Sequence, residues 1–279
     1  MVLVGCGHND AAVAQEHEVT PEPMQAPAEP TNTRGNEAPA TAEAPAETPE
    51  STPPPAEAEG PLAEWGELLA TYVTEDGGFR YQALHDSAED KAKLVRVSEY
   101  IGGADVSGLS RDEALAFYIN AYNIKTIHSV IHQWPIRSVM RVRGFFDRQT
   151  HPVAGEEITL NHLENEIIRS ERFAEPRIHF AVNCASAGCP PLQNRVFTAA
   201  NLEDLLEDGT RDFVRNSSQA SGRNLRVSQL FEWFAGDFEA QGGVKPFLAR
   251  YLEGEAAELA RGNGRVRFIP YDWDLNGRE

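Results

Sequence analysis

The sequence has 279 residues, of which 25 are basic and 43 acidic, and its formal net charge at pH 7 is −18. This length allows one large domain or two small ones. The excess of acids argues against nucleic acid as a partner, because there is no surplus of Lys and Arg to displace counterions from phosphates. The charge is also uneven, since residues 1–60 hold eleven acids and one base, Arg34.

The first residues predict a lipid anchor. Leu3-Val4-Gly5-Cys6 resembles the bacterial lipobox, in which a signal peptidase cuts before the cysteine and the new terminal cysteine is lipidated. The basic and long apolar parts of a signal peptide do not precede it, so residues 1–7 are expected to be a remnant of such a signal. A chance match in a cytosolic protein is the alternative.

The expected location is the periplasmic face of the cell envelope. Gly7 stands where Asp would signal retention in the inner membrane, so the outer membrane is favoured. No run of 18 apolar residues occurs in the sequence, which predicts no membrane-spanning helix and leaves the lipid on Cys6 as the membrane contact.

Residues 8–60 are predicted to be a disordered linker. They consist mainly of Pro, Ala, Glu and Thr, and they hold ten of the 18 prolines. Such a segment cannot bury enough apolar surface to offset the entropy lost on ordering. Proline and like charges would keep it extended as a spacer. The folded domain is therefore expected over residues 61–279.

The first half of this domain is predicted to be helical. Apolar residues recur at helical spacing over residues 62–73 and again over residues 87–101. Between these two helices, residues 76–81 contain two glycines and predict a turn followed by a short extended piece.

A third, longer helix is predicted from its capping signal. Ser110 and Glu113 have the spacing of a capping box and precede a long apolar run. The helix is expected to continue to about His132, because Pro135 cannot continue it.

The second half predicts strands among shorter helices. Its expected strands and hairpin end lie at residues 155–160, 177–183, 225–228 and 265–271, and its expected helices at 161–172, 201–216, 229–239 and 244–252. Asn161 is the expected cap of the first of these helices. Helices first and mixed elements later predict an α+β fold, a single domain with an N-terminal helical part and a small β-sheet. About 215 residues can bury one sizeable core.

Cys184 is the main candidate for a nucleophile. It closes the apolar run that begins at Arg177 and enters a loop of small residues, whose backbone N–H groups could stabilise an oxyanion. A cysteine nucleophile needs a nearby imidazole or helix N-terminus. His179 lies five residues upstream, but on a straight strand the two side chains would face opposite ways. His151 or His162 could instead be the base.

Two other roles for Cys184 stay open. It could be a buried structural thiol, or it could form a disulfide with Cys189, since free thiol pairs are unusual in an oxidising compartment. Pro190 and Pro191 fix the backbone after Cys189. Cys189 is therefore expected to staple the loop or to act as a redox partner rather than as the nucleophile.

Two amides and one acid are further candidates. Asn120 and Asn123 share one face of an otherwise apolar helix, where they either orient a site or make structural hydrogen bonds to a loop. Glu164 could orient a histidine, or it could be an ordinary acid on a helix surface that pairs with Arg169.

The sequence predicts no metal and no cofactor. His128 and His132 have the i, i+4 spacing of a helical metal pair, but the glutamate of the zincin motif is absent between them. No glycine-rich phosphate loop and no set of four Cys and His residues occurs. The C-terminal run from Tyr271 to Asn276 is expected to pack back onto the domain.

Several of these segments together resemble the domain of unknown function family numbered 547, found in bacterial and plant proteins. The resemblance spans roughly residues 62–276 and rests on these motifs: Ala116–Asn123, Gly144–Asp147, Leu160–Arg169, Pro176–Cys184, Gly188–Leu192 and Pro270–Asn276. It implies functional importance for the positions of Asn120, Asn123, Glu164, His179 and Cys184.

The resemblance also has limits. In plant members the position of Cys189 is often not cysteine, and Asn165 stands here where many relatives have His. A relation to the papain and transglutaminase group is a further suspicion.

The sequence thus predicts an envelope lipoprotein whose domain is a candidate thiol hydrolase or acyltransferase. Cys184 would be the nucleophile, His179 the base and Glu164 the orienting carboxylate, while Asn120 and Asn123 hold the loop. The substrate would be a peptide or a small molecule, and the protein is expected to be a monomer. The alternative is a non-catalytic binding or scaffold domain.

Overall fold

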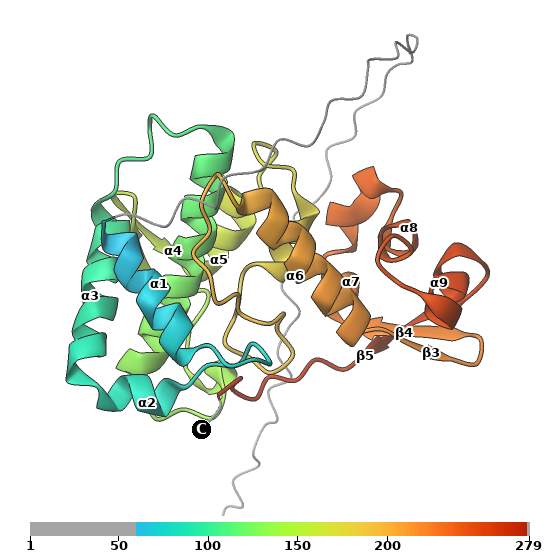
Figure 1. Cartoon of the computed structure of the whole chain (residues 1–279), viewed down its shortest axis with the longest axis horizontal. Coiled ribbons are helices and arrows are strands. Elements are labelled where there is room, and N and C mark those ends of the chain that lie inside the picture. The colour runs from blue at the N-terminus through green and yellow to red at the C-terminus, as the bar shows by residue number, and fades with distance from the viewer. Residues whose placement is uncertain (1–59, 278–279) are drawn as a thin grey trace, which may run out of the picture. The chain divides into compact units, whose positions relative to one another are not determined.

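A computed structural model describes residues 60–277 of the chain (Figure 1). The predicted lipidation of Cys6 and the predicted linker up to residue 59 lie outside the described residues. Within them, helices dominate and the strands form two small sheets, which confirms the predicted α+β class.

Three helices form the first layer of the domain: α1 (Pro61–Tyr72), α2 (Tyr81–Asp86) and α3 (Ala88–Gly103). Pro61 stands in the first turn of α1, where its missing N–H would be unpaired in any case. Ser87 caps α3 by accepting a hydrogen bond from the N–H of Asp90. The two helices predicted at 62–73 and 87–101 are thereby confirmed.

Helix α4 (Arg111–His132) is the centre of the core. The predicted capping box is present, because the Ser110 side chain accepts from Glu113 and the Glu113 side chain accepts from Ser110. Every residue from Ala114 to Ile127 is buried, polar ones included. A helix buried on all sides must satisfy its polar side chains within the protein, which explains why its amides contact neighbouring loops.

The strands form a hairpin and a three-stranded sheet. In the hairpin, β1 (Thr150–Val153) pairs antiparallel with β2 (Glu156–Thr159). The second sheet has the order β3-β4-β5, formed by β3 (Gln219–Ser221), β4 (Asn224–Ser228) and β5 (Arg265–Ile269). β4 pairs antiparallel with β3 and parallel with β5. The strands predicted at 225–228 and 265–271 are thus present, the latter two residues shorter.

The prediction of a strand at residues 177–183 is wrong. Residues Pro176–Phe180 form a 3-10 helix, η3, and the following residues form an irregular loop. Pro176 fits the first position of such a turn, and the Glu175 side chain caps it by accepting from the N–H of Arg177. A short buried apolar run has no periodicity that distinguishes a strand from a buried helical turn.

Two predicted helices are also corrected. The helix expected at 161–172 begins with α5 (Leu160–His162), continues as a π-helical turn, η2 (Leu163–Ile168), and is capped by Thr159 rather than by Asn161. The helix expected at 229–239 is divided into α7 (Leu230–Trp233) and the 3-10 helix η4 (Ala235–Gln241). The remaining helical elements are η1 (Val139–Arg141), α6 (Leu202–Asn216), α8 (Val244–Leu248) and α9 (Gly254–Arg261).

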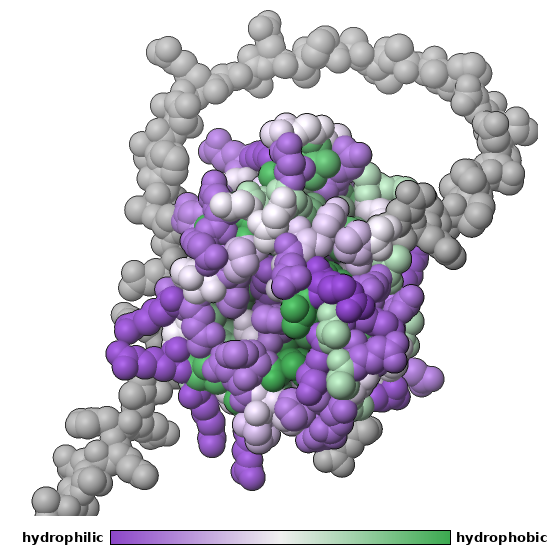
Figure 2. All heavy atoms as spheres, turned by 90° about the vertical axis from the view of Figure 1, so that its left-hand side faces the viewer, coloured by the Kyte–Doolittle hydropathy of each residue, from purple (hydrophilic) through white to green (hydrophobic). Residues whose placement is uncertain are grey.

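Helix α3 covers one side of the domain, drawn at the left of Figure 1. Figure 2 shows this side, where apolar atoms form an interrupted band between hydrophilic side chains. A pocket of about 270 Å³ between α2, α3 and α4 is lined by His85, His128 and His132, among others. Within residues 60–277, no three His, Cys, Asp or Glu side chains are grouped so that they could hold a metal ion. In the same range, no helix combines the length and apolar character that a bilayer crossing needs.

Candidate functional site

The two cysteines of the loop after η3 are joined by a disulfide. The Tyr271 hydroxyl lies 3.1 Å from Sγ of Cys184 and 3.1 Å from Sγ of Cys189. The Ser186 hydroxyl lies 2.8 Å from Sγ of Cys184, and the backbone N–H of Cys184 donates to Sγ of Cys189 at 2.9 Å. Both sulfurs are therefore surrounded by polar groups that can donate hydrogen bonds.

The C-terminal segment holds this loop in place. It runs antiparallel to the loop, with Ser186 bridged to Leu275, and the N–H of Gly188 donates to the carbonyl of Asp272 at 2.8 Å. A Cβ atom on Gly188 would lie 2.9 Å from the backbone nitrogen of Asp272, which is too close for a side chain. The close approach thus requires glycine and brings Tyr271 to the sulfurs.

The two asparagines of α4 make reciprocal hydrogen bonds to loop backbone. Asn123 donates to the carbonyl of Ala181 at 2.9 Å and accepts from the N–H of Asn183 at 2.8 Å, so it fixes the start of the cysteine loop. Asn120 makes both kinds of bond with Phe197 instead, at 2.7 and 3.2 Å. Only Asn123 therefore acts directly on the cysteine loop.

His179 of η3 is 2% exposed and has a carboxylate partner that the sequence analysis missed. Its Nε2 atom lies 2.6 Å from Oδ2 of Asp237 in η4, and its ring stacks on Phe234 with centroids 4.0 Å apart. Arg169 also binds Asp237, through Nε at 2.7 Å and Nη2 at 2.8 Å. Burial acts to raise the pKa of Asp237, but the hydrogen bonds from His179 and Arg169 outweigh it and lower that pKa.

Glu164 is a buried carboxyl that interacts electrostatically with His179 and with Tyr271. It is 5% exposed and belongs to the π-helical turn. Burial raises the pKa of Glu164, while the electrostatic interaction with His179 and a hydrogen bond from Tyr122 act in the opposite direction. The charge of Glu164 also contributes to the raised pKa of Tyr271, although burial is the main cause. Glu164 is thus an electrostatic neighbour of both His179 and Tyr271.

The structure separates the other histidines from this group. His151 is buried in β1, and burial together with the charges of Lys125 and His128 lowers its pKa to about 4. His162 is exposed at the end of α5. Of the three imidazoles considered as bases, His179 is the one whose charge acts on Glu164. Among the described residues, no hydrogen bond joins His179 directly to Cys184 or Cys189.

A pocket of about 380 Å³ opens beside the disulfide. Cys189, Ser186 and Tyr271 are among the residues that line it. The rest of its wall comes from the turn after α1, the end of α6, and the ends of β4 and β5, including Gly77, Ser217, Ser228 and Ile269. Of the two cysteines, Cys189 is the one that lines the pocket, whereas the sequence had directed attention to Cys184.

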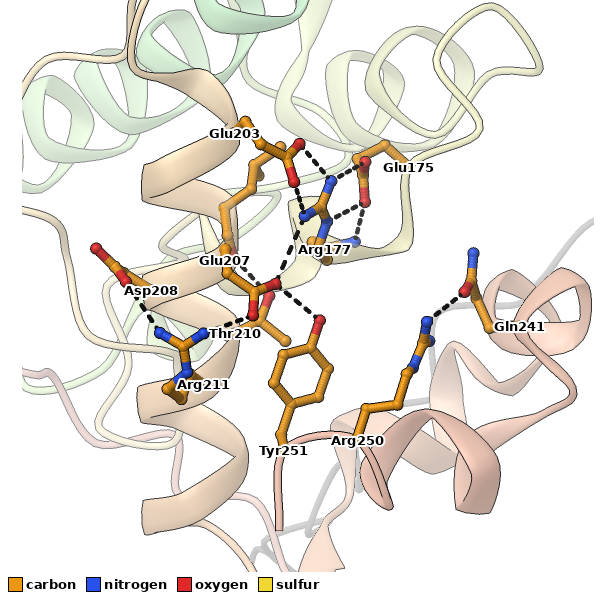
Figure 3. Close-up of polar contacts among 11 residues, drawn as sticks. Glu175, Arg177, Glu203, Glu207, Asp208, Thr210, Arg211, Gln241, Arg250 and Tyr251 are labelled. Carbon is orange, nitrogen blue, oxygen red and sulfur yellow. Dashed lines mark hydrogen bonds and ion pairs between the residues drawn. The ribbon is translucent and has the colours of Figure 1, made fainter. Parts of the chain in front are cut away.

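An ion-pair network anchors η3, which carries His179. Figure 3 shows the Arg177 guanidinium between Glu175 and Glu203, which it contacts at 2.7 and 2.6 Å. Glu207, also on α6, accepts a hydrogen bond from Tyr251 at 3.1 Å. The network ties η3 to α6 through charge-assisted hydrogen bonds, and it thereby helps to fix the backbone that carries His179.

Two residues of the candidate site, Asp237 and Tyr271, were not predicted from the sequence to have a role in it. Asp237 is an acid between Phe234 and Phe238 in an otherwise aromatic stretch, and that placement was the available signal. Tyr271 belongs to a C-terminal segment whose pattern was noted, but its contact with both sulfurs depends on the chain folding back over a long distance.

Comparison with known proteins gives one match. A family model described as "Protein of unknown function, DUF547" matches residues 106–214. The matched range includes Asn120, Asn123, Glu164, His179 and both loop cysteines, whereas Asp237 and Tyr271 lie outside it. Neither a curated protein nor a solved structure matches the chain.

Proposed function

We propose that this chain is a thiol-dependent hydrolase or acyltransferase that acts in the dithiol form of the Cys184–Cys189 pair, with Cys184 as the nucleophile. One observation carries the proposal, namely the set of donors around the sulfurs. The Tyr271 and Ser186 hydroxyls lie 3.1 and 2.8 Å from Sγ of Cys184. Hydrogen-bond donors favour a thiolate over a thiol, and the thiolate is the nucleophilic form.

The reaction begins once a dithiol reductant has converted the disulfide to two thiols and has itself become a disulfide. The Cys184 thiolate attacks an acyl carbon and forms a thioester, and the leaving group departs with a proton. Water or another acceptor then attacks the thioester and releases the thiol. In this scheme Tyr271 and Glu164 supply the path by which the thiol proton reaches the imidazole, because Tyr271 contacts the sulfurs and Glu164 interacts electrostatically with both Tyr271 and His179.

In this proposal Asp237 takes the part first given to Glu164. Its hydrogen bond to His179, at 2.6 Å, fixes the ring and stabilises the imidazolium that forms when the proton arrives. Glu164, whose pKa is raised by burial, is the group that can exchange a proton with its neighbours. Asn123 positions the loop through its two backbone hydrogen bonds.

The disulfide favours a second candidate, a non-catalytic binding domain. Two sulfurs joined to one another have no thiolate, and the pocket beside them then offers hydroxyl, amide, carboxylate and apolar surface but no nucleophilic sulfur. On this account the disulfide staples the loop, and the buried polar groups behind it are structural.

Labelling with an electrophilic thiol probe separates the two candidates. Cys6→Ser protein provides the background, so that only the loop cysteines can react. We expect the intact pair to be labelled rapidly only after reduction. Cys189→Ser, which cannot form the disulfide, should be labelled rapidly without reduction, and Cys184→Ser, which keeps only the Cys189 thiol, should be labelled much more slowly. If reduced Cys184 reacts no faster than a thiol in denatured protein, the hydrolase proposal fails and the binding domain is the better account. Faster reaction of Cys189 would transfer the nucleophile to the residue that lines the pocket.

We also propose that the domain acts as a monomer at the periplasmic face of the envelope, attached through a lipid on Cys6. The Leu3-Val4-Gly5-Cys6 motif and the linker-like composition that follows it support this proposal. Metabolic labelling with a fatty-acid analogue tests it: the wild-type chain should incorporate the label and the Cys6→Ser variant should not. Incorporation that is equal in both would refute the anchor.

A further inference from the structure

One face of the three-stranded sheet carries arginines. Side chains alternate along a strand, so alternate residues of β4 and β5 share a face. The register pairs Arg226 with Arg267 and Asn224 with Arg265. We call the three exposed arginines of this face, Arg226, Arg265 and Arg267, the arginine face.

These arginines have no acidic partner in the part of the chain that the structure describes. Within residues 60–277, none of the three side chains takes part in an ion pair or a hydrogen bond, whereas Arg169 and Arg177 are paired with acids. Like charges directly opposite one another on neighbouring strands repel. The repulsion among these arginines would be relieved by a bound anion, and such a cationic cluster stands out in a chain of net charge −18.

The arginine face borders a free sheet edge. β5 is the outer strand, and the N–H of Arg265 points toward β4 because it donates to the carbonyl of Arg223. Backbone groups alternate in direction along a strand, so those of Val266 and Phe268 point outward. The Phe268 side chain is 38% exposed on the opposite face from the arginines. An added strand would find backbone partners, cations on one face and an apolar side chain on the other.

The same face continues into the pocket beside the disulfide. Ser228 and Ile269 are the next members of the alternating sets on β4 and β5, and both line the pocket together with Cys189 and Tyr271. A chain lying along β5 is thereby directed to the sulfurs. Asp272 also lines the pocket, so an acid of the bound chain would be repelled at that end.

We propose that the outer edge of β5 binds an extended acidic peptide as an additional strand. Its acidic side chains, at every second position, lie over Arg265 and Arg267, its intervening apolar side chains lie beside Phe268, and a neutral portion enters the pocket. This inference goes beyond the proposed function, because edge binding needs no thiol chemistry and holds for either candidate. Main-chain hydrogen bonds supply affinity, and alternate side chains supply selectivity.

Fluorescence anisotropy on the full chain tests the proposal with three labelled peptides in which valine alternates with Glu, Gln or Lys. The Glu peptide should bind most tightly, and its binding should weaken as salt is added. In the double variant R265Q/R267Q, its dissociation constant should rise at least about fivefold, since two exposed ion pairs are lost. The double variant R141Q/R143Q is the matched control. It removes the same charge at the same spacing from exposed arginines outside the sheet, and should bind as wild type does.

The backbone part of the proposal is tested on the ligand, so that the protein stays unchanged. N-methylation of alternate peptide amides should abolish binding in one register and spare it in the other. Equal binding of the Glu and Gln peptides, or an unchanged constant in R265Q/R267Q, overturns the proposal and leaves the arginines as charges that prevent edge pairing. A single-stranded oligonucleotide that competes at equal charge concentration would overturn the peptide assignment as well. The oxidised protein, in which the Cys184–Cys189 disulfide leaves no thiolate, should bind the Glu peptide, which separates this result from the thiol labelling.

Discussion

The Nε2 atom of His179 lies 2.6 Å from Oδ2 of Asp237, a residue 58 positions away along the chain. The ring of His179 is buried, and the carboxylate also holds Arg169. A buried imidazole that has a carboxylate on one nitrogen and stacks on an aromatic ring has a fixed orientation. This pair is the most strongly defined part of the candidate site, and three of the four predictions below concern it or the groups that interact with it.

Replacing Asp237 with Asn should lower stability and flatten its dependence on acidic pH. The folded-state pKa of Asp237 lies below its ordinary value, so the folded protein binds fewer protons than the unfolded chain in acid. The stabilisation is therefore complete above about pH 5 and is lost as pH falls through the folded pKa. We expect a loss of about 2 kcal/mol at pH 7, because Arg169 keeps a buried, unneutralised charge.

Urea unfolding at pH 3 to 7 measures this effect. Glu239→Gln, an exposed acid of the same helix, is the control and should change little. An Asp237→Asn variant with the stability and acid profile of wild type would show that the His179–Asp237 contact does not form in solution.

Glu164→Gln should change the pH dependence of stability in the direction opposite to Asp237→Asn. Burial raises the pKa of Glu164, so the folded protein holds a proton on this carboxyl at pH values where the unfolded chain has lost it. Stability therefore falls as pH rises from about 4.5 through the folded pKa, and glutamine should remove that fall. The variant should be as stable as wild type or up to about 1 kcal/mol more stable at neutral pH.

Denaturant titrations from pH 4 to 8 provide the measurement for Glu164. Glu166→Gln changes an exposed acid of the same turn and keeps the wild-type profile as the matched control. A steeper decline of stability in Glu164→Gln than in wild type would contradict the buried position of the carboxyl.

Because Lys125 is buried, the stability of the protein should rise with pH in mildly alkaline solution. The residue is 1% exposed, its Nζ atom donates to the carbonyl and hydroxyl of Ser98, and burial lowers its pKa to about 8. Between this value and the ordinary lysine pKa, the unfolded chain binds the extra proton, so stability rises with pH by up to roughly 3 kcal/mol. Unfolding measured from pH 7.5 to 10.5 should show this rise in wild type and in Lys91→Met, but not in Lys125→Met.

Tyr271→Phe should slow the reaction of the reduced cysteines at neutral pH. The hydroxyl lies 3.1 Å from each sulfur, and its removal takes away a donor that favours the thiolate. In reduced protein, the midpoint of the alkylation rate against pH should move upward by about half a unit to one unit. Tyr100→Phe, which alters an exposed ring on α3, should leave the midpoint unchanged. A midpoint that is the same in Tyr271→Phe would remove Tyr271 from the proposed proton path.

The sequence was most informative where a local signal determines structure. Ser110, Glu113 and Pro135 bound α4 correctly, because a capping box and a proline act on the backbone next to them. The segment around His179 failed, because an apolar run without polar residues at regular intervals fits a strand and a buried 3-10 turn equally well. The argument that His179 and Cys184 face opposite ways assumed the alternation of a strand, so it does not hold for the 3-10 helix that is present.

The residues that contact His179 and the cysteines could not be predicted from local sequence patterns. Asp237 meets His179, and Tyr271 meets the cysteines, only because distant segments pack together. Neither residue has a periodicity or spacing that marks it, and no local rule gives the register of β5 against β4, which aligns Arg226 with Arg267. The family resemblance identified Glu164, His179 and Cys184, but it could not name the contacts between them.

The antiparallel contact between the cysteine loop and the C-terminal segment has a consequence for how the protein is made. Ser186 pairs with Leu275, and the N–H of Asn276 donates to the carbonyl of Ala185. During synthesis, α4 and its neighbours can pack before residues 271–276 have been made. For that time the cysteines have no contact with Tyr271. The sulfurs acquire their surroundings only once residues 271–276 have been made, so a chain interrupted before them would hold a packed α4 and an incomplete site.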